Sequence, residues 1–370
     1  MSDVPHLRFP EFSGEWVETT LGKISEITKG SGISKDQLSE QGSPCILYGE
    51  LYTKYKSEII DEVYSRTELD SSSLVKSKAN DVIIPCSGET AIDISTARCV
   101  PFDNILLGGD LNIIRLKHDD GGFFAYQLNG ARKKDIARVA QGVSVVHLYG
   151  ENLKQIRVYH PNIEEQKKIT RLLSLIDERI ATQNKIIEKL ETLIKGIVET
   201  VISSQKPNTL IKNCLECNSS TLQESQVAET GTFPVYGATD ISGYTETAGI
   251  NGESILIIKD GSGVGTVKFV SGEYSYIGTL NSLTAKDGYC LKYIYFALQR
   301  FSFEPYKTGM AIPHIYFKDY GKAKIYCPSF SLQTLIAQKL SLIENKMEVE
   351  KRIILCYQLQ RSYLLSRMFI

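Results

Sequence analysis

The residues best able to do chemistry in this sequence form few of the patterns that catalysis requires. Cys214 and Cys217 form a single CxxC motif. A structural zinc site needs four ligands, and no second CxxC or close histidine pair supplies the others. A redox CxxC lies in a βαβ setting of the thioredoxin type, which the surrounding sequence does not predict. We therefore expect neither a metal site nor a redox site at these cysteines.

The glycine-rich stretch DGSGVGTVKFV (260–270) resembles a nucleotide-binding loop only in composition. A dinucleotide fingerprint joins a strand to a helix, whose N-terminus meets the pyrophosphate. Here the loop follows the strand pattern SILII and leads into a second one, TVKFV, so a tight β-turn is predicted. The sequence also lacks a GxxxxGK[ST] loop, an HExxH motif, a GxSxG elbow and the Asn-Pro-Pro-aromatic tetrapeptide of amino-methyltransferases.

Basic residues gather at two places, each near the end of one half of the chain. Clusters of this kind contact nucleic-acid phosphates, although a solvated helix face is the alternative. His147 and His314 accompany the two clusters at corresponding positions, which suits a duplicated binding role or a fold position better than one catalytic centre. The candidate DNA-contacting residues are Arg132, Lys133, Lys134, Arg138, His147, Lys154, Lys307, His314, Lys318 and Lys322.

The overall charge neither indicates nor excludes a nucleic-acid partner. The 370 residues include 42 Lys and Arg and 43 Asp and Glu, for a net charge of −1. Residues 1–160 hold 18 basic against 22 acidic residues, which counts against DNA binding there. No long apolar run predicts a membrane span, and the N-terminus has no secretory pattern. The eight scattered cysteines suggest reduced thiols and a cytoplasmic protein.

An internal repeat organises the chain. PNIEEQKKITRLLSLID (161–177) and PSFSLQTLIAQKLSLIE (328–344) match at a constant separation of 167 residues, from Pro161 to Pro328. The match continues backwards without a gap, since GVSVVHLYG (142–150) corresponds to GMAIPHIYF (309–317). Looser matches precede it in the same order, PCILYGE with FPVYGAT and GGDLNII with IGTLNSL. The sequence therefore predicts a tandem of two related halves.

Each tight copy begins a long helix with apolar residues spaced alternately four and three apart, which is typical of coiled coils. The first seam runs from Ile169 to Val201, and the second is interrupted by Arg361. Gln183 and Glu350 are polar residues at matching seam positions, where they would fix the register. Two independent amphipathic helices are the alternative. The predicted helix-pairing residues are Ile169, Leu173, Ile176, Ile187, Ile336, Leu340, Ile343 and Ile354.

Upstream of each long helix, short β-branched runs alternate with Gly, Ser and Asn turns, so each half is predicted to be a mixed α/β globule. A helix is expected near the end of each globule, over 123–140 and 289–301, and a linker over 203–210. The predicted class is α+β, with a pseudo-two-fold internal repeat. The predicted divisions are a first globule at 1–160, helices at 161–205 and 328–370, and a second globule at 206–327.

This layout resembles the specificity (S) subunits of type I restriction–modification systems. The signature Pro-x-x-Glu-Gln-x-x-Ile stands at Pro161–Ile169, and its second copy at Pro328–Ile336 keeps Pro, Gln and Ile but lacks the Glu. The N-terminal PHLRFPEFSGEW, VYG at 235–237 and GSGVG at 261–265 are also similar to that family. The resemblance covers essentially the whole chain through the order of its motifs rather than through any single one.

The resemblance implies a non-catalytic protein with two target-recognition domains, each reading one half of a split double-stranded DNA sequence. The two long helices would pack antiparallel and bind two methyltransferase (M) subunits. Those subunits would hold S-adenosylmethionine, so no cofactor is expected on this chain, and restriction (R) subunits would cut. A tandem protein-interaction module without a DNA role, and a stand-alone DNA methyltransferase or nuclease, are the alternatives.

Overall fold

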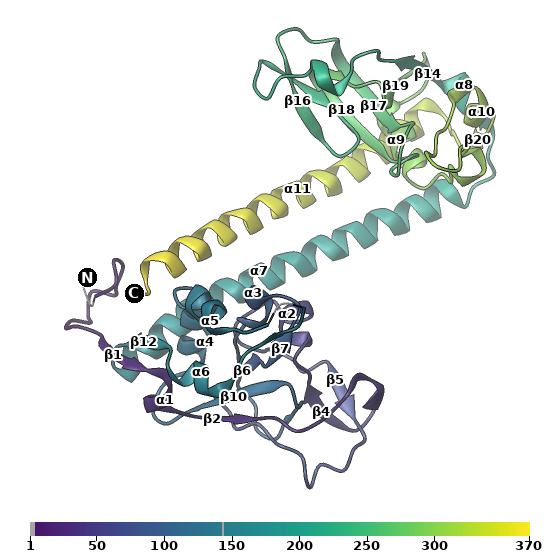
Figure 1. The fold of residues 1–370 in the computed structure, drawn as a ribbon. Coiled ribbons are helices and arrows are strands. Elements are labelled where there is room, and N and C mark those ends of the chain that lie inside the picture. Colours follow the sequence, from purple (N-terminus) through teal and green to yellow (C-terminus); the bar gives the residue numbers. More distant parts are fainter. Residues whose placement is uncertain (1–3, 143) are drawn as a thin grey trace. The chain divides into compact units, whose positions relative to one another are not determined.

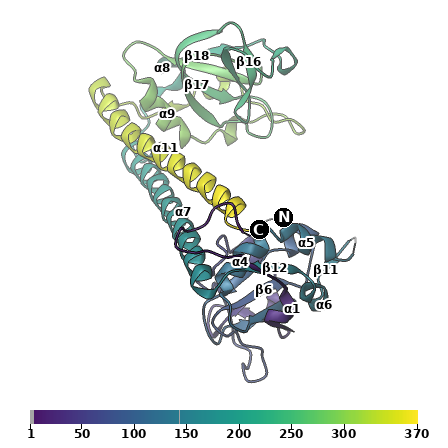
Figure 2. The ribbon, with the colours of Figure 1, turned by 90° about the vertical axis from the view of Figure 1, so that its left-hand side faces the viewer.

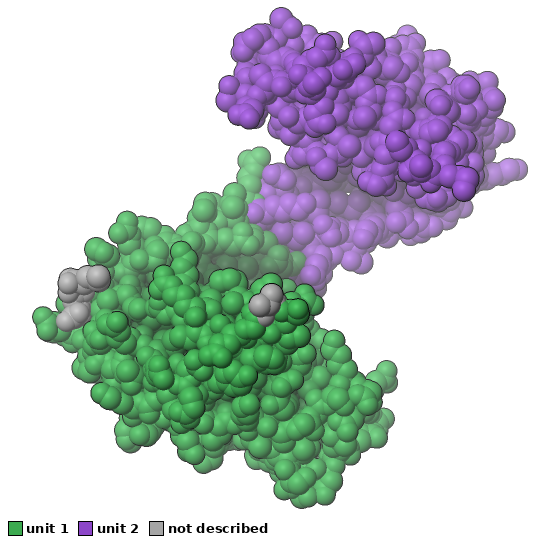
Figure 3. Space-filling view, in the orientation of Figure 1, with its two compact units in different colours: residues 1–184, 352–370 green, residues 185–351 purple. Residues whose placement is uncertain are grey.

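The computed structural model describes residues 4–142 and 144–370, so positions 1–3 and 143 of the predicted first globule lie outside the described residues. The chain forms two compact units, which Figure 3 shows in different colours. Unit 1 comprises residues 1–184 and 352–370, and unit 2 comprises residues 185–351. Each unit thus contains one globule and a part of both long helices. Among the described residues, no helix is long and apolar enough to cross a membrane.

The described residues of unit 1 form twelve short strands and the helices around them (Figure 1). The strands are β1 (Val17–Thr20), β2 (Ser25–Lys29), β3 (Leu38–Ser39), β4 (Ser43–Ile46), β5 (Ser65–Thr67), β6 (Asp81–Pro85), β7 (Ser87–Gly88), β8 (Arg98–Val100), β9 (Leu106–Leu107), β10 (Leu111–Leu116), β11 (Val146–His147) and β12 (Arg157–His160). The helices are α1 (Leu21–Ile24), α2 (Glu50–Thr53), α3 (Ala91–Ile94), α4 (Gly121–Asn129), α5 (Lys133–Val139), α6 (Gly150–Lys154) and the first part of α7 (Ile163–Val198).

The central sheet of unit 1 has the strand order β2-β10-β6-β8, and its neighbouring strands are antiparallel. The buried helix α4 and α7 contribute Phe123, Phe124 and Leu173 to the core that includes Val82 and Ile114 of this sheet. A second sheet has the order β3-β5-β4-β9. Every residue of β6 is buried, and the apolar run Val82–Pro85 is what a strand at the centre of a core requires. Asp81 at its start pairs with Arg115 at 2.7 Å.

Unit 2 repeats this plan with fewer and longer strands. They are β13 (Thr209–Leu210), β14 (Leu215–Ser219), β15 (Phe233–Tyr236), β16 (Ile241–Thr245), β17 (Ile250–Ile258), β18 (Val267–Tyr276), β19 (Leu280–Ala285) and β20 (Lys324–Ile325). The helices are α8 (Ile211–Cys214), α9 (Leu291–Gln299), α10 (Phe317–Tyr320) and the first part of α11 (Phe330–Arg367). The sheet order β14-β19-β17-β18-β15-β16 begins with the same four-strand arrangement as in unit 1.

Strand registers show which positions of the two units are equivalent. Val82 pairs with Ile114 on one side and with Cys99 on the other. Ile255 pairs in the same way with Leu283 and with Phe269. Cys99 and Phe269 therefore occupy the same place in the two sheets. The predicted internal repeat is confirmed, including the loose match that aligns β10 with β19.

Two local predictions have different outcomes. The prediction of a single helix over 123–140 is wrong. The helix is interrupted at Gly130, so this stretch forms two helices, α4 and α5. Glycine disfavours a helix interior because its backbone loses the most conformational freedom on ordering. The β-turn predicted for GSGVG is confirmed, since this stretch joins the antiparallel strands β17 and β18.

The two long helices run antiparallel, because each unit combines the beginning of one with the end of the other. Figures 1 and 2 both show α7 and α11 side by side. In unit 1, Ile169 and Leu173 of α7 share a core with Leu364 of α11 and with Met368, which directly follows that helix. In unit 2, Ile194 and Val198 of α7 share a core with Ile336 and Leu340 of α11. The predicted pairing of the helices is confirmed.

The first seam does not extend to Val201 as predicted. Val198 and Ile202 are buried at 1% and 3% exposure, whereas Val201 is 37% exposed. A π-helical turn occupies Glu199–Ser203, immediately after α7. The buried residues here join the core of the second globule, which includes Ile211 and Cys214. The globule, rather than the opposite helix, decides which face of the chain is buried at this point.

The glutamine of the repeated signature fastens each long helix to its globule. The Gln166 amide donates to the carbonyl of Pro161 at 2.9 Å and accepts from the backbone N–H of Asp120 at 2.9 Å. Gln333 donates to Pro328 O at 2.8 Å and accepts from Cys290 N–H at 3.0 Å. Asp120 and Cys290 are the N-caps of α4 and α9. Both copies therefore satisfy an otherwise unpaired helix N-terminus with the same side chain.

The glutamate missing from the second signature has a structural role in unit 1 alone. Glu165 is fully buried and accepts two hydrogen bonds of 2.7 Å from Arg8, in the N-terminal segment. Nearby, the Leu7 N–H donates to Arg367 O at the end of α11. The corresponding residue of the second copy, Leu332, is exposed and has no such segment over it. The glutamate of the first copy thus serves a contact with Arg8 that Leu332 does not make.

Candidate nucleic-acid interface

Two equivalent hairpin loops stand out on the surfaces of the globules. In unit 1, Gln141 and His147 exchange backbone hydrogen bonds of 2.9 and 2.7 Å. In unit 2, Thr308 and His314 exchange bonds of 2.9 and 2.8 Å in the same pattern. Each loop exposes apolar side chains at its tip, namely Val145 in the first and Met310 and Ile312 in the second.

The hairpins depend on a repeated glycine. Gly142 has φ +121° and Gly309 has φ +88°, a region that other residues rarely adopt. A Cβ atom at these positions would also collide with the carbonyl oxygens of Val145 and Ile312. Each loop then presents its histidine beside a tyrosine, with ring centroids 6.2 Å apart for His147 and Tyr149 and 5.1 Å apart for His314 and Tyr316.

Four of the predicted DNA-contacting residues lie at α5, and they differ in exposure and in their contacts within the chain. Arg132 pairs with Asp135 at 3.2 Å, bonds to the carbonyl of Ile370 and lies over the ring of Tyr159. Burial lowers the pKa of the half-buried Lys133, and the nearby Arg98 lowers it further. Arg138 is exposed but pairs with Asp135 at 3.0 Å. Lys134 is exposed, so Lys134 and Arg138 are the more accessible cations of this cluster.

The remaining predicted DNA-contacting lysines differ in whether they form ion pairs with carboxylates of this chain. Lys154 pairs with Glu151 at 2.6 Å, and Lys307 pairs with Glu304. Lys318 is exposed and lies 5.0 Å from the ring centroid of Tyr316, next to the hairpin of unit 2. Lys322 is exposed one turn beyond it. Unit 2 therefore brings His314, Lys318 and Lys322 close together in the chain, beside an exposed apolar loop tip.

The predicted helix-pairing residues are mostly buried inside their own units. Ile169, Leu173 and Ile176 belong to the core of unit 1, and Ile336 and Leu340 to that of unit 2. Ile343 packs against the core of unit 2, Ile354 is buried and Ile187 is half-buried. These side chains are therefore largely withdrawn from the surface, whereas α11 exposes Leu335, Leu342, Val349, Leu355, Leu359 and Tyr363.

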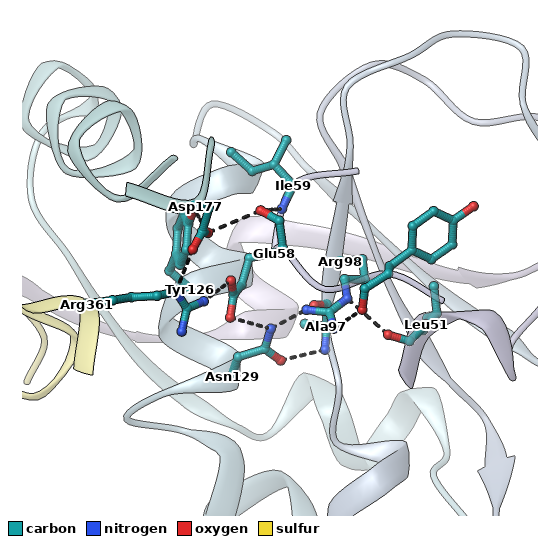
Figure 4. A network of polar contacts seen from close by, with 11 residues as sticks. Leu51, Glu58, Ile59, Ala97, Arg98, Tyr126, Asn129, Asp177 and Arg361 are labelled. Carbon is teal, nitrogen blue, oxygen red and sulfur yellow. Dashed lines mark hydrogen bonds and ion pairs between the residues drawn. The ribbon is translucent and has the colours of Figure 1, made fainter. Parts of the chain in front are cut away.

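A network of buried charges lies where α7 and α11 meet the first globule (Figure 4). Arg361 of α11 pairs with Glu58 and, at 2.6 Å, with Asp177 of α7. Tyr126 of α4 donates to Asp177 at 2.7 Å. Burial opposes the charge on Arg361, but the carboxylates of Glu58 and Asp177 outweigh this effect and raise its pKa. The arginine that interrupts the second seam is thus matched by two acidic partners.

The equivalent place in unit 2 is an open groove of about 770 Å³. Ile194 stands at the position of Arg361, and Glu344 at that of Asp177, 167 residues away in each case. Glu344 pairs with Lys292 at 2.8 Å instead of with an arginine. The apolar lining of the groove includes Ile194, Leu298, Phe301, Phe303 and Met347.

The CxxC residues are separated by the change from α8 to β14. The buried Cys214 thiol donates to the carbonyl of Ile211 at 3.2 Å, and Cys217 is half-buried on the strand. Throughout the part of the chain that the structure describes, no three His, Cys, Asp or Glu residues form a group suited to a metal ion.

The similarity of this chain to known proteins shows the same duplication. The sequence profile of the type I restriction modification DNA specificity domain matches residues 13–192 and again 213–355. The chain belongs to this family. Its structure is similar to the S subunit of a type I restriction–modification system from M. genitalium, with a TM-score of 0.73, 19% identity and 99% of each chain covered.

A second solved structure has a similar fold. It comes from work on the complex assembly and conformational transition of the type I R-M system. The TM-score is 0.52 at 14% identity, over 96% of this chain and 97% of that one. At such low identities these likenesses establish the fold. The specificity role of this chain follows from the family match, which covers both halves.

Several structural features of this surface were not found from sequence. In the sequence, Val145 and Met310 do not differ from apolar residues of the core, so their exposure at the loop tips was not predicted. The equal spacing of Gly142 and His147 and of Gly309 and His314 does indicate that both halves contain the same loop. The pairing of Arg361 with Glu58 joins residues 303 positions apart, and no local pattern reveals such a contact. The role of Gln166 and Gln333 could have been suspected from the sequence, because both copies of the repeat keep a glutamine at this position.

Proposed function

We propose that each globule of this specificity protein reads one half of a bipartite double-stranded DNA target, while the paired helices bind methyltransferase subunits. The observation that supports this most is the duplication itself. Two related globules present equivalent hairpins, closed at His147 and at His314, on a shared scaffold. Duplicated readers suit split targets, as dimeric DNA-binding proteins recognise two half-sites. Divergent surfaces on the two globules would read an asymmetric sequence.

Phosphate contacts in this proposal come from the basic residues that are exposed beside the hairpins. Lys318 and Lys322 serve one half-site, and Lys134 and Arg138 serve the other, with His147 and His314 at the loop edges. Such contacts position the protein without reading sequence, and base edges carry the specificity. The exposed tips at Val145, Met310 and Ile312 are suited to apolar contact with bases, for example with the methyl group of thymine.

The helices supply the surface for the methyltransferase subunits. On α11 the residues Leu335, Leu342 and Val349 are exposed at intervals of one heptad, away from the buried seam. A partner helix with its own apolar stripe would cover them by coiled-coil packing. In this proposal the chain itself has no catalytic activity. S-adenosylmethionine binds the methyltransferase subunits, and restriction subunits join the complex for cleavage.

A domain exchange tests the function directly. Residues 1–159 are replaced by the same globule of a relative with a different target, and methylated adenines are mapped genome-wide in cells containing the methyltransferase subunit. One half of the methylated sequence should change and the other half should stay. An unchanged sequence would refute the reading role of the first globule. Methyl transfer by the purified chain alone would instead favour a stand-alone enzyme.

Partner binding by the helices has its own test. Leu342→Asp and Val349→Asp place charges on the exposed stripe and should prevent co-elution with the methyltransferase subunit in size-exclusion chromatography. Ile176→Asp and Ile343→Asp, at the seam, should disturb the pairing of the helices as well. Retention of the complex in the stripe variants would show that the subunit binds elsewhere. A complex that assembles but retains no DNA sequence selectively would favour the interaction module without a DNA role.

A further inference from the structure

The groove in unit 2 lies where unit 1 accommodates a segment of its own chain. In unit 1 this segment is Ser57–Ile60. Its Ser57 hydroxyl donates to Asp177 at 3.1 Å, and its Glu58 pairs with Arg361. The equivalent residues of unit 2, Glu344 and Ile194, line the open groove instead. The repeat therefore shows what kind of occupant this place is built for.

The occupant in unit 1 is a short strand added to the edge of the sheet. Cys99 N–H of β8 donates to Glu58 O at 2.7 Å, and Ile60 N–H donates to Cys99 O at 3.0 Å. Ile59 and Cys99 form a parallel bridge. Next to it, the Asn129 side chain bonds both the N–H and the C=O of Ala97, at 2.7 and 2.8 Å. Every outward backbone group of Ala97 and Cys99 is thus satisfied.

The equivalent edge of β18 has no such cover. Ile258 N–H donates to Thr266 O at 3.0 Å, so the alternating pattern of an antiparallel ladder directs the N–H and C=O of Val267 and Phe269 away from β17. The only strand on that side, β15, pairs with Ser275 and Tyr276. Within the described chain no strand pairs with the outer edge between Val267 and Glu273. An open edge of this kind accepts an extended peptide.

The chemistry of the groove differs from that of unit 1 in one decisive respect. Ile194 replaces Arg361, so an acidic side chain at the position of Glu58 would lose the arginine with which it pairs in unit 1. Of the cations that line the groove, Arg300 pairs with Glu199 at 3.6 Å and Lys307 pairs with Glu304. An apolar side chain there would instead contact Ile194, Leu298 and Met347. The groove is also continuous with both long helices, because Glu191, Ile194 and Lys195 come from α7 and Glu344 and Met347 from α11.

We propose that this groove binds an extended segment of the methyltransferase subunit, which adds to β18 as a parallel strand at Val267–Phe269 and buries an apolar side chain against Ile194. This inference rests on the proposed function for the identity of the partner. Its geometry comes from Ser57–Ile60, and the continuity with α7 and α11 points to the subunit that those helices bind. In unit 1 the equivalent edge at Cys99 is already covered by Ser57–Ile60, so the proposed site belongs to unit 2.

A peptide copied from unit 1 is a suitable probe. The native segment of residues 54–62, KYKSEIIDE, and the same peptide with Glu58→Leu are labelled and titrated with the full-length protein. The leucine peptide should bind at least about tenfold more tightly than the native peptide, since only it avoids burying a carboxylate. Equal binding of the two peptides, or none by either, would overturn the proposed anchor.

Two variants of the protein sharpen the test. Phe269→Pro removes the outward N–H at an edge position that tolerates proline and should abolish binding of the leucine peptide. Ile194→Arg copies Arg361 into the groove and should reverse the preference in favour of the native peptide. If Phe269→Pro prevents folding, the peptide preference of Ile194→Arg still tests the proposal. An Ile194→Arg protein that continues to prefer the leucine peptide would contradict it.

Hydrogen exchange in the assembled complex identifies the source. The outward amides of Val267, Phe269 and Ser271 should become protected when the methyltransferase subunit is added to the full-length protein, and adding DNA alone should leave them unchanged. Protection by DNA alone would overturn the proposal. Sequence-specific methylation by the same complex is measured in parallel. A complex that methylates its target while these amides stay exposed would refute the strand addition and leave the proposed function intact.

Discussion

Each unit has a corner where the two long helices meet its globule, and the helices and the sheet are arranged alike at both corners. The side chains differ: charged residues fill the corner of unit 1, whereas the corner of unit 2 is an open groove lined in part by apolar residues. Unit 1 closes its corner with charge, since Arg361 pairs with Glu58 and Asp177 beneath Tyr126. Unit 2 leaves it open, with Ile194 at the position of the arginine and Glu344 turned to Lys292. The fold therefore does not dictate whether this corner is filled. Unit 1 fills it with Ser57–Ile60, a segment of a loop that has no counterpart in unit 2.

The features that the two units share are those that attach the helices to the globules. Gln166 and Gln333 bond equivalent groups, and the hairpins closed at His147 and His314 have the same backbone pairing. The features that differ are charges, loop lengths and exposed side chains. A fixed scaffold with divergent surfaces is what a protein with two different recognition domains requires.

The charges of unit 1 match its corner to the arginine of α11, since Arg361 pairs with Glu58 and Asp177. Two buried carboxylates without a cation would be costly, so an isoleucine in place of Arg361 would not serve there. The corner of unit 2 makes no such demand on Ile194. Such networks contribute less to stability than to the choice of partner, because the desolvation of the charges offsets much of their attraction.

The largest expected effect comes from breaking this network. Arg361→Met should destabilise unit 1 by about 3–5 kcal/mol, because it leaves Glu58 and Asp177 buried without their cation. Trp16 is the single tryptophan of the chain, and it packs against Phe123 and Phe369 in unit 1. Its fluorescence during urea unfolding therefore reports on unit 1 alone.

The matched control is the equivalent position of unit 2. Ile194→Met conserves volume and should cost less than about 1.5 kcal/mol, with no change in the Trp16 transition. Adding Glu58→Gln to Arg361→Met should recover part of the lost stability, since it removes one unpaired charge. Equal destabilisation by Arg361→Met and Ile194→Met would show that the charges of unit 1 have no special role.

The sequence predicted the repeat, the fold class and the helix pairing because these depend on patterns that recur at a fixed separation. Pro161 and Pro328, or His147 and His314, are visible without any knowledge of contacts. It also showed that Arg361 interrupts a seam. It did not show why, because the partner Glu58 lies in a loop of the first globule that has no counterpart in the second half.

The basic candidates illustrate a second limit of the sequence. Arg132 and Arg138 look alike in a run of cations, yet Arg132 holds the carbonyl of Ile370 and the ring of Tyr159 while Arg138 reaches the surface. Which arginine is exposed depends on where Ile370 packs, and composition does not encode that. The break at Gly130 between α4 and α5 was also missed, because the residues on either side both favour helix.

A smaller effect should separate the two signature glutamines. Gln166→Ala removes bonds to Asp120, Pro161 and, at 2.8 Å, the Asp119 carboxylate, whereas Gln333→Ala removes those to Cys290 and Pro328. Each variant should lose about 1–3 kcal/mol, with the greater loss for Gln166→Ala. Hydrogen exchange at the first turns of α4 and α9 measures both. A larger loss in the second copy would contradict this ranking.

DNA binding should distinguish the basic residues of the two units. Replacing Lys318 and Lys322 together by Gln should lower the slope of log affinity against log salt by about two, one for each lost phosphate contact. Lys133 and Arg138 replaced by Gln should change it less, because Lys133 is half-buried and Arg138 pairs with Asp135. Lys154→Gln, next to Glu151, is the single-charge control. A slope unchanged by the first pair would exclude Lys318 and Lys322 as phosphate contacts.

The smallest expected effect is a difference in acid sensitivity around His160, which unit 2 replaces with Cys327. Burial acts to raise the pKa of Asp119, but hydrogen bonds from His160 and Gln166 outweigh it and leave that pKa below its usual value. The carboxylate thus contributes stability above the unfolded-state pKa of about 3.9, and this contribution is lost as pH falls through the lower folded-state pKa. Urea midpoints from Trp16 fluorescence should therefore fall less steeply below about pH 4 in Asp119→Asn than in the parent protein. Parallel curves for the two proteins would show that Asp119 ionises equally in both states and that the His160 contact contributes nothing to the difference between the units.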